Sequence, residues 1–298
     1  MRIPTQSISD GITRQLATLS SRQAKLQNQV ATGQRIFQPE DDPASVGRIL
    51  TLQTERTQVQ QFARNTDRAL QLSQASFAGL QSVKKISDRA GELATLGVGA
   101  QSSDAFHAYA TELDQLIEQG IQQGNTKLGN DFIFGGTAVD TSPFTAVRDV
   151  NGKVTSITYA GTAASAPVQI SENSSITPGT NGPTNQGLAG FLNNLVALRN
   201  ALQSANSASV QAARPALDDS ENKLVNTMGE NGAVQLRIEV AKDQLSTRFQ
   251  DSEKLISGET DADLPETIVK LNQTQTAYQA ALQSASIIMK MSLLDYLR

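Results

Sequence analysis

Residues 264–289 read LPETIVKLNQTQTAYQAALQSASIIM, and their apolar side chains recur at alternating intervals of four and three residues. That spacing places one stripe along a helix and is typical of a coiled-coil seam. Gln275 is a polar residue on the stripe, and such a residue favours one register of pairing over another. The stretch therefore predicts a long helix packed along one face of a partner helix. The complete stripe is Leu264, Ile268, Leu271, Gln275, Tyr278, Leu282, Ala285 and Met289.

A second stripe of the same kind lies near the start of the chain. Residues 12–30 read ITRQLATLSSRQAKLQNQV, and Gln23 occupies the polar position of this heptad seam. The two stripes predict terminal helices that pair with a partner helix. Pairing of Gln23 with Gln275 is a hypothesis that spacing alone does not establish. The apolar positions of the second stripe are Ile12, Leu16, Leu19, Leu26 and Val30.

After Val30 the helical pattern stops. Gly33 is a candidate for the residue just past the helix end, and Pro39 prevents the helix from continuing. Asp42 is expected to be the N-cap of the next helix, with Pro43 as its first residue, where a missing N–H costs nothing. The sequence therefore predicts a connector between two helices at this point.

Helical periodicity returns in two long stretches on either side of a segment with a different pattern. The first covers residues 44–130, with an interruption at Gly97–Ser103, and the second covers residues 188–257. A break is expected near Pro215, because proline removes a backbone donor inside a helix. Gly258 is expected to end the second stretch. Antiparallel pairing of the two stretches would give each apolar stripe a partner.

The segment between these stretches carries strand and turn signals. Residues 131–136 are aromatic, branched and glycine-punctuated, and Val168 and Ile170 mark a further strand. Asn151-Gly152 lies between arms of strand-like sequence and is a strong hairpin signal, because both residues tolerate a positive φ. Residues 131–187 are therefore expected to form a small β insertion.

These patterns predict a mainly α protein, built as an elongated antiparallel helical rod with terminal coiled-coil helices and a small β insertion domain. Only 4% of the residues are aromatic and there is no Trp, so the chain has few large side chains for one broad core. The predicted division has three parts. They are a terminal coiled-coil assembly region at 1–43 and 258–298, a helical rod at 44–130 and 188–257, and the β insertion at 131–187.

The composition excludes several kinds of chemistry. With no Cys and a single histidine, His107, the chain lacks the residues for thiol catalysis, zinc fingers or two-histidine metal sites, and no cofactor or metal is expected. A net charge of −4 without a Lys/Arg block argues against nucleic-acid binding, and no apolar run is long enough for membrane insertion. The acidic pairs lie beside Pro, Gly or Ser, where capping is expected rather than catalysis. These pairs are Asp41/Asp42, Asp218/Asp219 and Asp261/Asp263.

The terminal stripes have two interpretations. An intramolecular coiled coil is one of them, and periodicity does not exclude it. However, apolar residues that lie off the seam near the C-terminus are typical of an assembly interface. We therefore predict assembly with further copies or with a partner through both ends of the chain. The predicted interface consists of Ile12, Leu16, Leu19, Leu26, Val30, Leu264, Ile268, Leu271, Tyr278, Leu282, Met289, Leu293, Leu294 and Leu297.

Short motifs at both ends carry a resemblance to a known family. VATGQRI at 30–36, followed by PEDDPA at 39–44, resembles a signature near the N-terminus of the flagellar hook-associated protein 3 family. LGNDFIFGGT at 128–137 resembles the family's Gly-Gly segment. DADL at 261–264 and SLLDYL at 292–297 resemble its C-terminal elements. The chain therefore resembles this family of flagellin relatives in two terminal blocks, and the β insertion carries little of the likeness.

The resemblance implies a non-enzymatic structural protein of the bacterial flagellum, at the junction between hook and filament. It implies an extracellular location, reached through the flagellar export channel without a cleaved signal peptide. The implied partners are the first hook-associated protein, flagellin and further copies of the chain in a ring. An export chaperone is the implied partner of the C-terminal helix. By position, the residues from Leu264 to Leu297 are those to which the coiled-coil role and the chaperone-binding role both extend.

Two other functions stay open at this point. A flagellin subunit of the filament has the same general plan, although Pro43 after the acidic pair and the ending LLDYLR favour the junction protein. An adhesin-like binding module in residues 131–187 is the alternative from a different class. That segment has no His, Cys or Trp, so it offers neither a metal cluster nor a Trp for sugar stacking.

Overall fold

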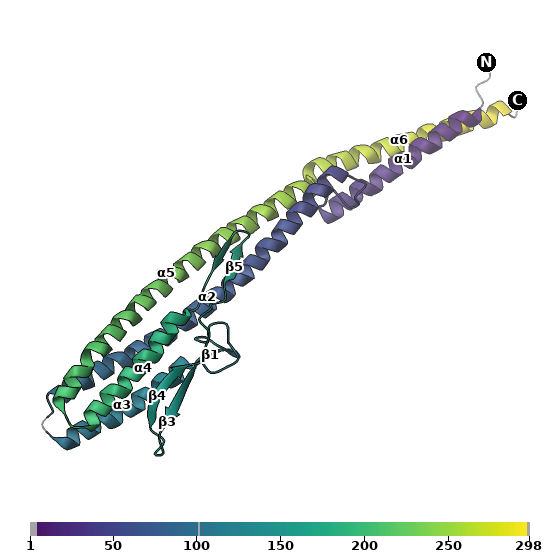
Figure 1. The fold of residues 1–298 in the computed structure, drawn as a ribbon. Coiled ribbons are helices and arrows are strands. Elements are labelled where there is room, and N and C mark those ends of the chain that lie inside the picture. The colour runs from purple at the N-terminus through teal and green to yellow at the C-terminus, as the bar shows by residue number, and fades with distance from the viewer. Residues whose placement is uncertain (1–4, 101, 297–298) are drawn as a thin grey trace. The chain divides into compact units, whose positions relative to one another are not determined.

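The computed structural model describes residues 5–100 and 102–296, with side chains described from residue 10 to residue 287. Helices make up most of these residues, and the predicted mainly α fold class is confirmed (Figure 1). Three helices precede the strands and three follow them in the described part of the chain. They are α1 (Thr5–Thr32), α2 (Pro43–Val98), α3 (Ser103–Gly124), α4 (Gly182–Gln203), α5 (Ser207–Thr260) and α6 (Leu264–Tyr296).

The strands form separate antiparallel hairpins between α3 and α4. β3 and β4 face each other with Phe144 opposite Tyr159, and the turn that joins them contains Asn151 and Gly152. Gly152 has φ +82°, a left-handed conformation that glycine adopts without strain. The hairpin signal in the sequence is therefore confirmed. The pairs are β1 (Lys127–Leu128) with β2 (Asp131–Phe132), β3 (Phe144–Arg148) with β4 (Val154–Tyr159), and β5 (Val168–Ser171) with β6 (Ser174–Ile176).

Contacts within the chain divide it into two compact units. The terminal unit consists of residues 1–57 and 249–298, and the central unit consists of residues 58–248. α1 and α6 belong to the terminal unit, together with the beginning of α2 and the end of α5. The remaining helices and the hairpins belong to the central unit. The three-part division at residues 43, 130, 187 and 257 stays a prediction.

In the central unit, α2 and α5 pack antiparallel. Every seventh residue of α5 between 210 and 245 is buried, which is the repeat of a heptad seam. Residue numbers fall along α5 as they rise along α2, because Lys242 pairs with Asp67 (2.7 Å) and Glu221 pairs with Lys84 (3.0 Å). α3 and α4 pack against each other beside this pair, so the helices of the central unit share one apolar core.

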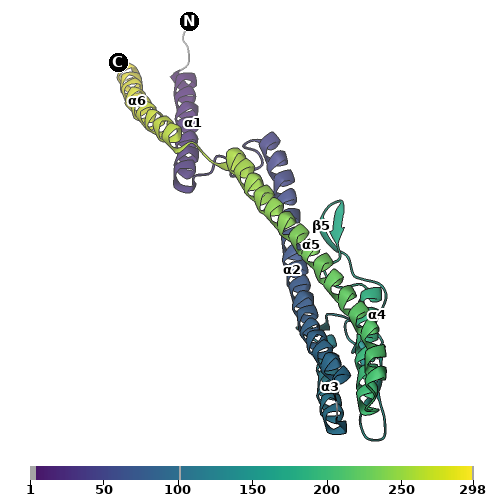
Figure 2. The same cartoon turned by 90° about the vertical axis from the view of Figure 1, so that its left-hand side faces the viewer.

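The hairpins are fixed to this helical core. β3 and β4 lie against α3 and α4. The β5–β6 hairpin places Ile170 and Ile176 against Ala69 of α2 and Ile238 of α5, and Figure 2 shows β5 next to α5. The strands are short and exposed on one side, so most of their burial comes from the helices beneath them.

Large side chains of the core pack directly against glycines on the helices. A Cβ atom added at Gly79 of α2 would lie 2.8 Å from Cζ of Phe134, and one at Gly124 of α3 would lie 2.7 Å from Cδ2 of Phe144. Real Cβ contacts are not that short. Both phenylalanines are fully buried, and they seat the loop after β2 and the start of β3 on the helices.

The expected helix break at Pro215 is wrong. α5 runs without interruption from Ser207 to Thr260 and contains Pro215. Val210 and Leu217 are buried on either side of the proline, so packing of both turns against the core holds the helix together despite the missing hydrogen bond. Gly258 also lies inside α5, and the helix ends two residues later.

Replacing Pro215 by alanine is expected to stabilise the central unit by about 2 kcal/mol. Proline in a helix interior is about 3 kcal/mol less favourable than alanine, and the loss of its restraint on the unfolded chain offsets part of that gain. Urea unfolding followed by circular dichroism measures the change. The exposed Asn222→Ala on the same helix is the control and should add less than about 1 kcal/mol. An unchanged or lower stability of Pro215→Ala would contradict this account.

Candidate functional site: the terminal helix pair and its joint

The predicted stripe of α1 faces α6 in the terminal unit. α1 and α6 lie side by side (Figure 1). Leu26 is buried, and the other stripe residues are half-buried, whereas most of the residues between them are exposed. The half-buried residues are Ile12, Leu16, Leu19, Gln23 and Val30. The structure therefore brings the α1 stripe together as the inner face of an intramolecular helix pair.

The face that α6 turns inward differs from the stripe read in its sequence. The least exposed residues of α6 also recur at intervals of four and three, but most of them are small Thr and Ala residues rather than Leu or Ile. Ile268 and Leu282, by contrast, are 45% and 44% exposed. Because α1 supplies bulky Leu and Ile side chains, small Thr and Ala side chains on α6 allow the close approach. The inward residues are Thr267, Leu271, Thr274, Tyr278, Ala281 and Ala285.

This arrangement leaves large apolar side chains of α6 in contact with solvent. Leu264, Ile268 and Leu282 lie four and fourteen residues apart, which places them along one side of the helix, next to the inward face. We call these three residues the outer stripe. Val269 and Ile287 are exposed on another side of α6. The helix pair thus leaves apolar surface without an intramolecular partner in the described residues.

Four of the predicted interface residues lie beyond the described side chains. Met289, Leu293 and Leu294 belong to α6, whose backbone is described as far as Tyr296. Leu297 lies outside the described residues. Their part in an interface stays a prediction.

Two connectors join the α1–α6 pair to the adjoining ends of α2 and α5. Gly33, with φ +74°, follows the end of α1. Asp42 precedes Pro43, the first residue of α2, and its Oδ1 accepts a hydrogen bond from the Ser45 N–H (3.1 Å). Asp263 caps α6 in the same way, by accepting from the Glu266 N–H (3.1 Å). Carboxylates of two acidic pairs therefore serve as helix caps.

A cluster of polar side chains surrounds the Asp42 cap. The Ser45 hydroxyl is buried and donates to Asp42 Oδ2 (2.6 Å), while it accepts from Arg35 (3.3 Å) and Arg48 (2.9 Å). Arg48 also binds both carboxylate oxygens of Glu259, at the end of α5, each at 2.9 Å. We call Arg35, Asp42, Ser45, Arg48 and Glu259 the joint cluster. Of these five residues, Asp42 alone was predicted to have a role. Glu259 lies more than 200 positions away from the others in the sequence, so no local pattern indicates that they meet.

The pKa values of Asp41, Asp42 and Glu259 lie below their ordinary values, because each carboxylate accepts hydrogen bonds at the joint. Donation from the Ser45 hydroxyl and N–H lowers the pKa of Asp42 from 3.8 to about 2, with a smaller contribution from Arg35. Hydrogen bonds from Lys25 and from the N–H groups of Phe37 and Gln38 lower the pKa of Asp41 to about 2. The folded joint therefore favours these carboxylates in their charged form.

The joint is expected to weaken in acid. Because the folded pKa values of Asp41 and Asp42 lie below 3.8, these groups contribute stability above about pH 4, and the contribution is lost as pH falls toward 2. Asp42→Asn keeps an N-cap and removes the charge. The thermal midpoint of the terminal helices should therefore differ between wild type and Asp42→Asn at pH 7, with a difference that shrinks below pH 4. A constant difference across this range would rule out the charge as its cause.

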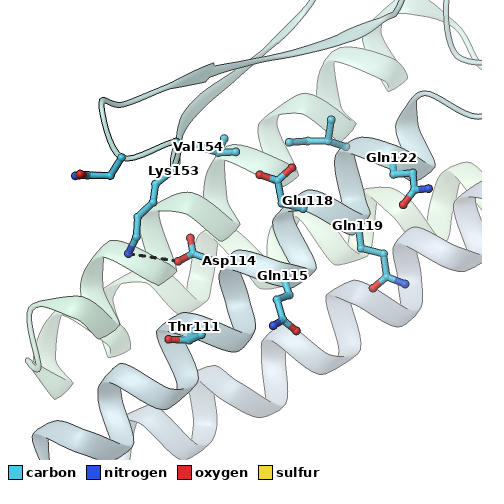
Figure 3. Close-up of a pocket in the computed structure, with 11 residues that line it drawn as sticks. Thr111, Asp114, Gln115, Glu118, Gln119, Gln122, Lys153 and Val154 are labelled. Carbon is cyan, nitrogen blue, oxygen red and sulfur yellow. Dashed lines mark ion pairs between the residues drawn. The ribbon is translucent and has the colours of Figure 1, made fainter.

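A groove between α3 and the β3–β4 hairpin is the other candidate site. Figure 3 shows Asp114 of α3 joined to Lys153 of the hairpin, with Glu118 on the next turn of the same helix. Asp114 pairs with the buried Arg199 (2.6 Å) and with Lys153 (3.6 Å). Glu118 pairs with Arg148, and that hydrogen bond lowers the pKa of Glu118.

This pattern differs from that of a general acid, whose pKa must be raised. Instead, Arg199 of α4 also donates to the Val154 carbonyl (2.8 Å) and so ties the hairpin to α3 and α4. Sequence reasoning missed Arg199, since a single arginine in a helical pattern carries no sign of burial. The acid pair Asp218/Asp219 and His107 are exposed on their helices.

Membrane spans and metal sites were the other two features considered in the sequence. Within residues 5–100 and 102–296, none of the helices combines the length and apolarity that crossing a bilayer needs. The same part of the chain contains no grouping of three or more His, Asp or Glu side chains placed to hold a metal ion.

Comparison with known proteins finds similar sequences among flagellar proteins. Residues 3–138 match the bacterial flagellin N-terminal helical region. The flagellar hook-associated protein 3 of Escherichia coli is 25% identical over 327 residues, which cover 98% of each chain. That of Salmonella typhimurium is 24% identical over 312 residues, again covering 98% of each.

Solved structures share the fold. The structure of a flagellar hook-associated protein from Vibrio parahaemolyticus covers 74% of this chain and all of its own, with a TM-score of 0.65 and 18% identity. The likeness in sequence covers 98% of this chain. The resemblance of this chain to flagellar hook-associated protein 3 is confirmed over 98% of its length, and its N-terminal part matches the flagellin N-terminal helical region.

Proposed function

We propose that this protein is a structural subunit of the bacterial flagellum that joins the hook to the filament, without catalysis. The observation that carries the proposal is the outer stripe of α6, where Leu264, Ile268 and Leu282 are exposed on a helix already paired on its inward face. A subunit that works by packing needs such a surface. The likeness to flagellar hook-associated protein 3 over the whole chain supports the same function.

The energetics favour association through this stripe. Full burial of one Leu or Ile side chain contributes about 1.5–3 kcal/mol. Leu264, Ile268 and Leu282 are 41%, 45% and 44% exposed, so each has less than half of that gain left to make. Repetition of the contact around a closed assembly adds these gains and so offsets the ordering cost of association. The inward residues of both helices, such as Leu16 and Leu271, act indirectly by holding α6 in place.

The partners follow from this position in the flagellum. The first hook-associated protein would lie on the hook side, flagellin on the filament side, and further copies of this chain beside it in a ring. An export chaperone would cover α6 before assembly, since the exposed apolar side chains need a partner inside the cell. The protein would act outside the cell, after export without a cleaved signal peptide.

The predicted three-part division fits this function. The terminal coiled-coil region at 1–43 and 258–298 would pack with its neighbours, and the rod at 44–130 and 188–257 would support it. The β insertion at 131–187 would project from the rod. Of the predicted interface residues, those on the outer stripe are the ones available to neighbours in the described side chains.

Deletion of the gene tests the function. Cells without the protein should build hooks, make and export flagellin, and lose it to the medium because nothing anchors the filament. The expected result is complete loss of filaments, with recovery when the wild-type gene is supplied. Normal filaments in the deletion strain would sink the proposal. If this chain proved to be the most abundant filament protein, the flagellin alternative would replace it.

A further inference from the structure

The two connectors of the terminal unit run antiparallel, side by side. Gln34 and Asp261 form an antiparallel bridge. The Ala262 N–H donates to the Gly33 carbonyl (2.8 Å), and the Arg35 N–H donates to the Thr260 carbonyl (2.7 Å). The link from α1 to α2 and the link from α5 to α6 therefore form one joint rather than two independent loops.

The Arg35 side chain joins both sides of this joint. Its guanidinium donates to Asp42 (3.2 Å) and Ser45 (3.3 Å) at the start of α2. It also donates to the Glu259 carbonyl (2.9 Å) near the end of α5. The carbonyl of Arg35 accepts from the Gln29 side chain of α1 (2.9 Å). One residue thus contacts three helices through its side chain and backbone.

Apolar packing gives the joint little support. In the described part of the terminal unit, the buried apolar residues are Leu26, Ile49 and Ala285. Phe37, within the connector itself, is 40% exposed. Hydrogen bonds and ion pairs are directional, and the planar guanidinium offers several donors in a fixed geometry. The direction in which α1 and α6 leave the joint therefore depends on polar contacts.

We propose that Arg35 is a positioning residue that fixes the α1–α6 pair at a set angle to the adjoining ends of α2 and α5. Each of its contacts is partly exposed and so stabilises the fold only weakly. The guanidinium nevertheless holds residue 35 against the start of α2 and the end of α5, while the Arg35 carbonyl binds Gln29 of α1. Together these contacts restrict the angle between α1 and the two adjoining helix ends. This role concerns the geometry of the monomer, and it stands apart from the proposed place in the flagellum.

Distances between spin labels test the role directly. The chain has no Cys, so Gln53→Cys on α2 and Gln273→Cys on α6, both exposed, give two unique labelling positions within the terminal unit. Pulsed electron paramagnetic resonance on the full-length monomer then yields the distribution of distances between them. We expect a narrow distribution for the parent protein and at least a twofold broader one for Arg35→Ala, at unchanged helix content.

Two further variants sharpen the test. Arg14→Ala removes an exposed arginine of α1 whose side chain, among the described residues, bonds to the Asp10 carbonyl of its own helix (3.2 Å), and it should leave the distribution narrow. Arg35→Lys keeps the positive charge but lacks the several fixed donors of the planar guanidinium, and it should give an intermediate width. An unchanged width for Arg35→Ala overturns the proposal. So does a loss of helix content in that variant, because Arg35 would then serve folding rather than positioning.

Discussion

Replacing Phe134 by alanine is expected to lower the free energy of unfolding of the central unit by about 4 kcal/mol. The side chain is fully buried and fills the space opposite Gly79. Removing the ring forfeits its burial and leaves a cavity that a helix without a side chain at position 79 has no means to fill. The Phe134 carbonyl accepts from Tyr159 (3.0 Å) and Asn185 (2.9 Å), so these bonds would hold the backbone around the cavity rather than let it collapse.

Urea unfolding monitored by circular dichroism measures this loss. Phe37→Ala is the matched control, because Phe37 is 40% exposed and lies in the other unit. Its effect should stay below about 1 kcal/mol. A loss below about 1.5 kcal/mol for Phe134→Ala would mean that the surrounding residues repack, and the account of Gly79 as a fixed seat for the ring would be wrong.

Leu282→Asp is expected to leave the monomer folded and to abolish attachment of filaments. Leu282 belongs to the outer stripe, so aspartate at this position meets solvent in the monomer and costs little. In an assembly, the same carboxylate would be buried against apolar surface, which costs several kcal/mol unless it finds a partner. We expect at least a tenfold reduction in the number of cells with filaments, because the defect recurs in every subunit.

The readout is electron microscopy of cells, with flagellin in the medium as the second measure. Gln283→Asp introduces the same charge at the next residue, off the outer stripe, and should leave attachment normal. Leu271→Asp is the informative contrast, because Leu271 faces inward and its loss should loosen the helix pair in the monomer. Normal filaments with Leu282→Asp would show that the outer stripe is not an interface.

Features with local causes could be predicted from the sequence. The turn at Asn151-Gly152 depends on Gly152, which takes the positive φ (+82°) that the turn requires, whereas Asn151 does not adopt one. The start of α2 depends on Asp42 and Pro43, whose preferences operate within one helical turn. The stripe of α1 could be predicted because its bulky residues repeat without competition from a second apolar line.

Features that depend on distant partners could not be predicted. α6 carries two lines with nearly the same repeat, and the choice between Ile268 and Thr267 as an inward residue depends on the size of the side chains that α1 presents. Arg35 contacts Glu259 because the two connectors run antiparallel beside each other in the folded chain. Pro215 stays helical because core contacts on either side outweigh a local preference.

The scarcity of buried apolar residues in the terminal unit has a thermodynamic consequence. The heat-capacity change of unfolding and the denaturant sensitivity both grow with the apolar surface that unfolding exposes. With Leu26, Ile49 and Ala285 as its described buried apolar residues, the terminal unit should melt over a wide temperature range with little heat absorbed. Binding of neighbours shifts such a transition upward by mass action. Its melting temperature is therefore a property of subunit concentration, and calorimetry of dilute and polymerised protein should differ most in this transition.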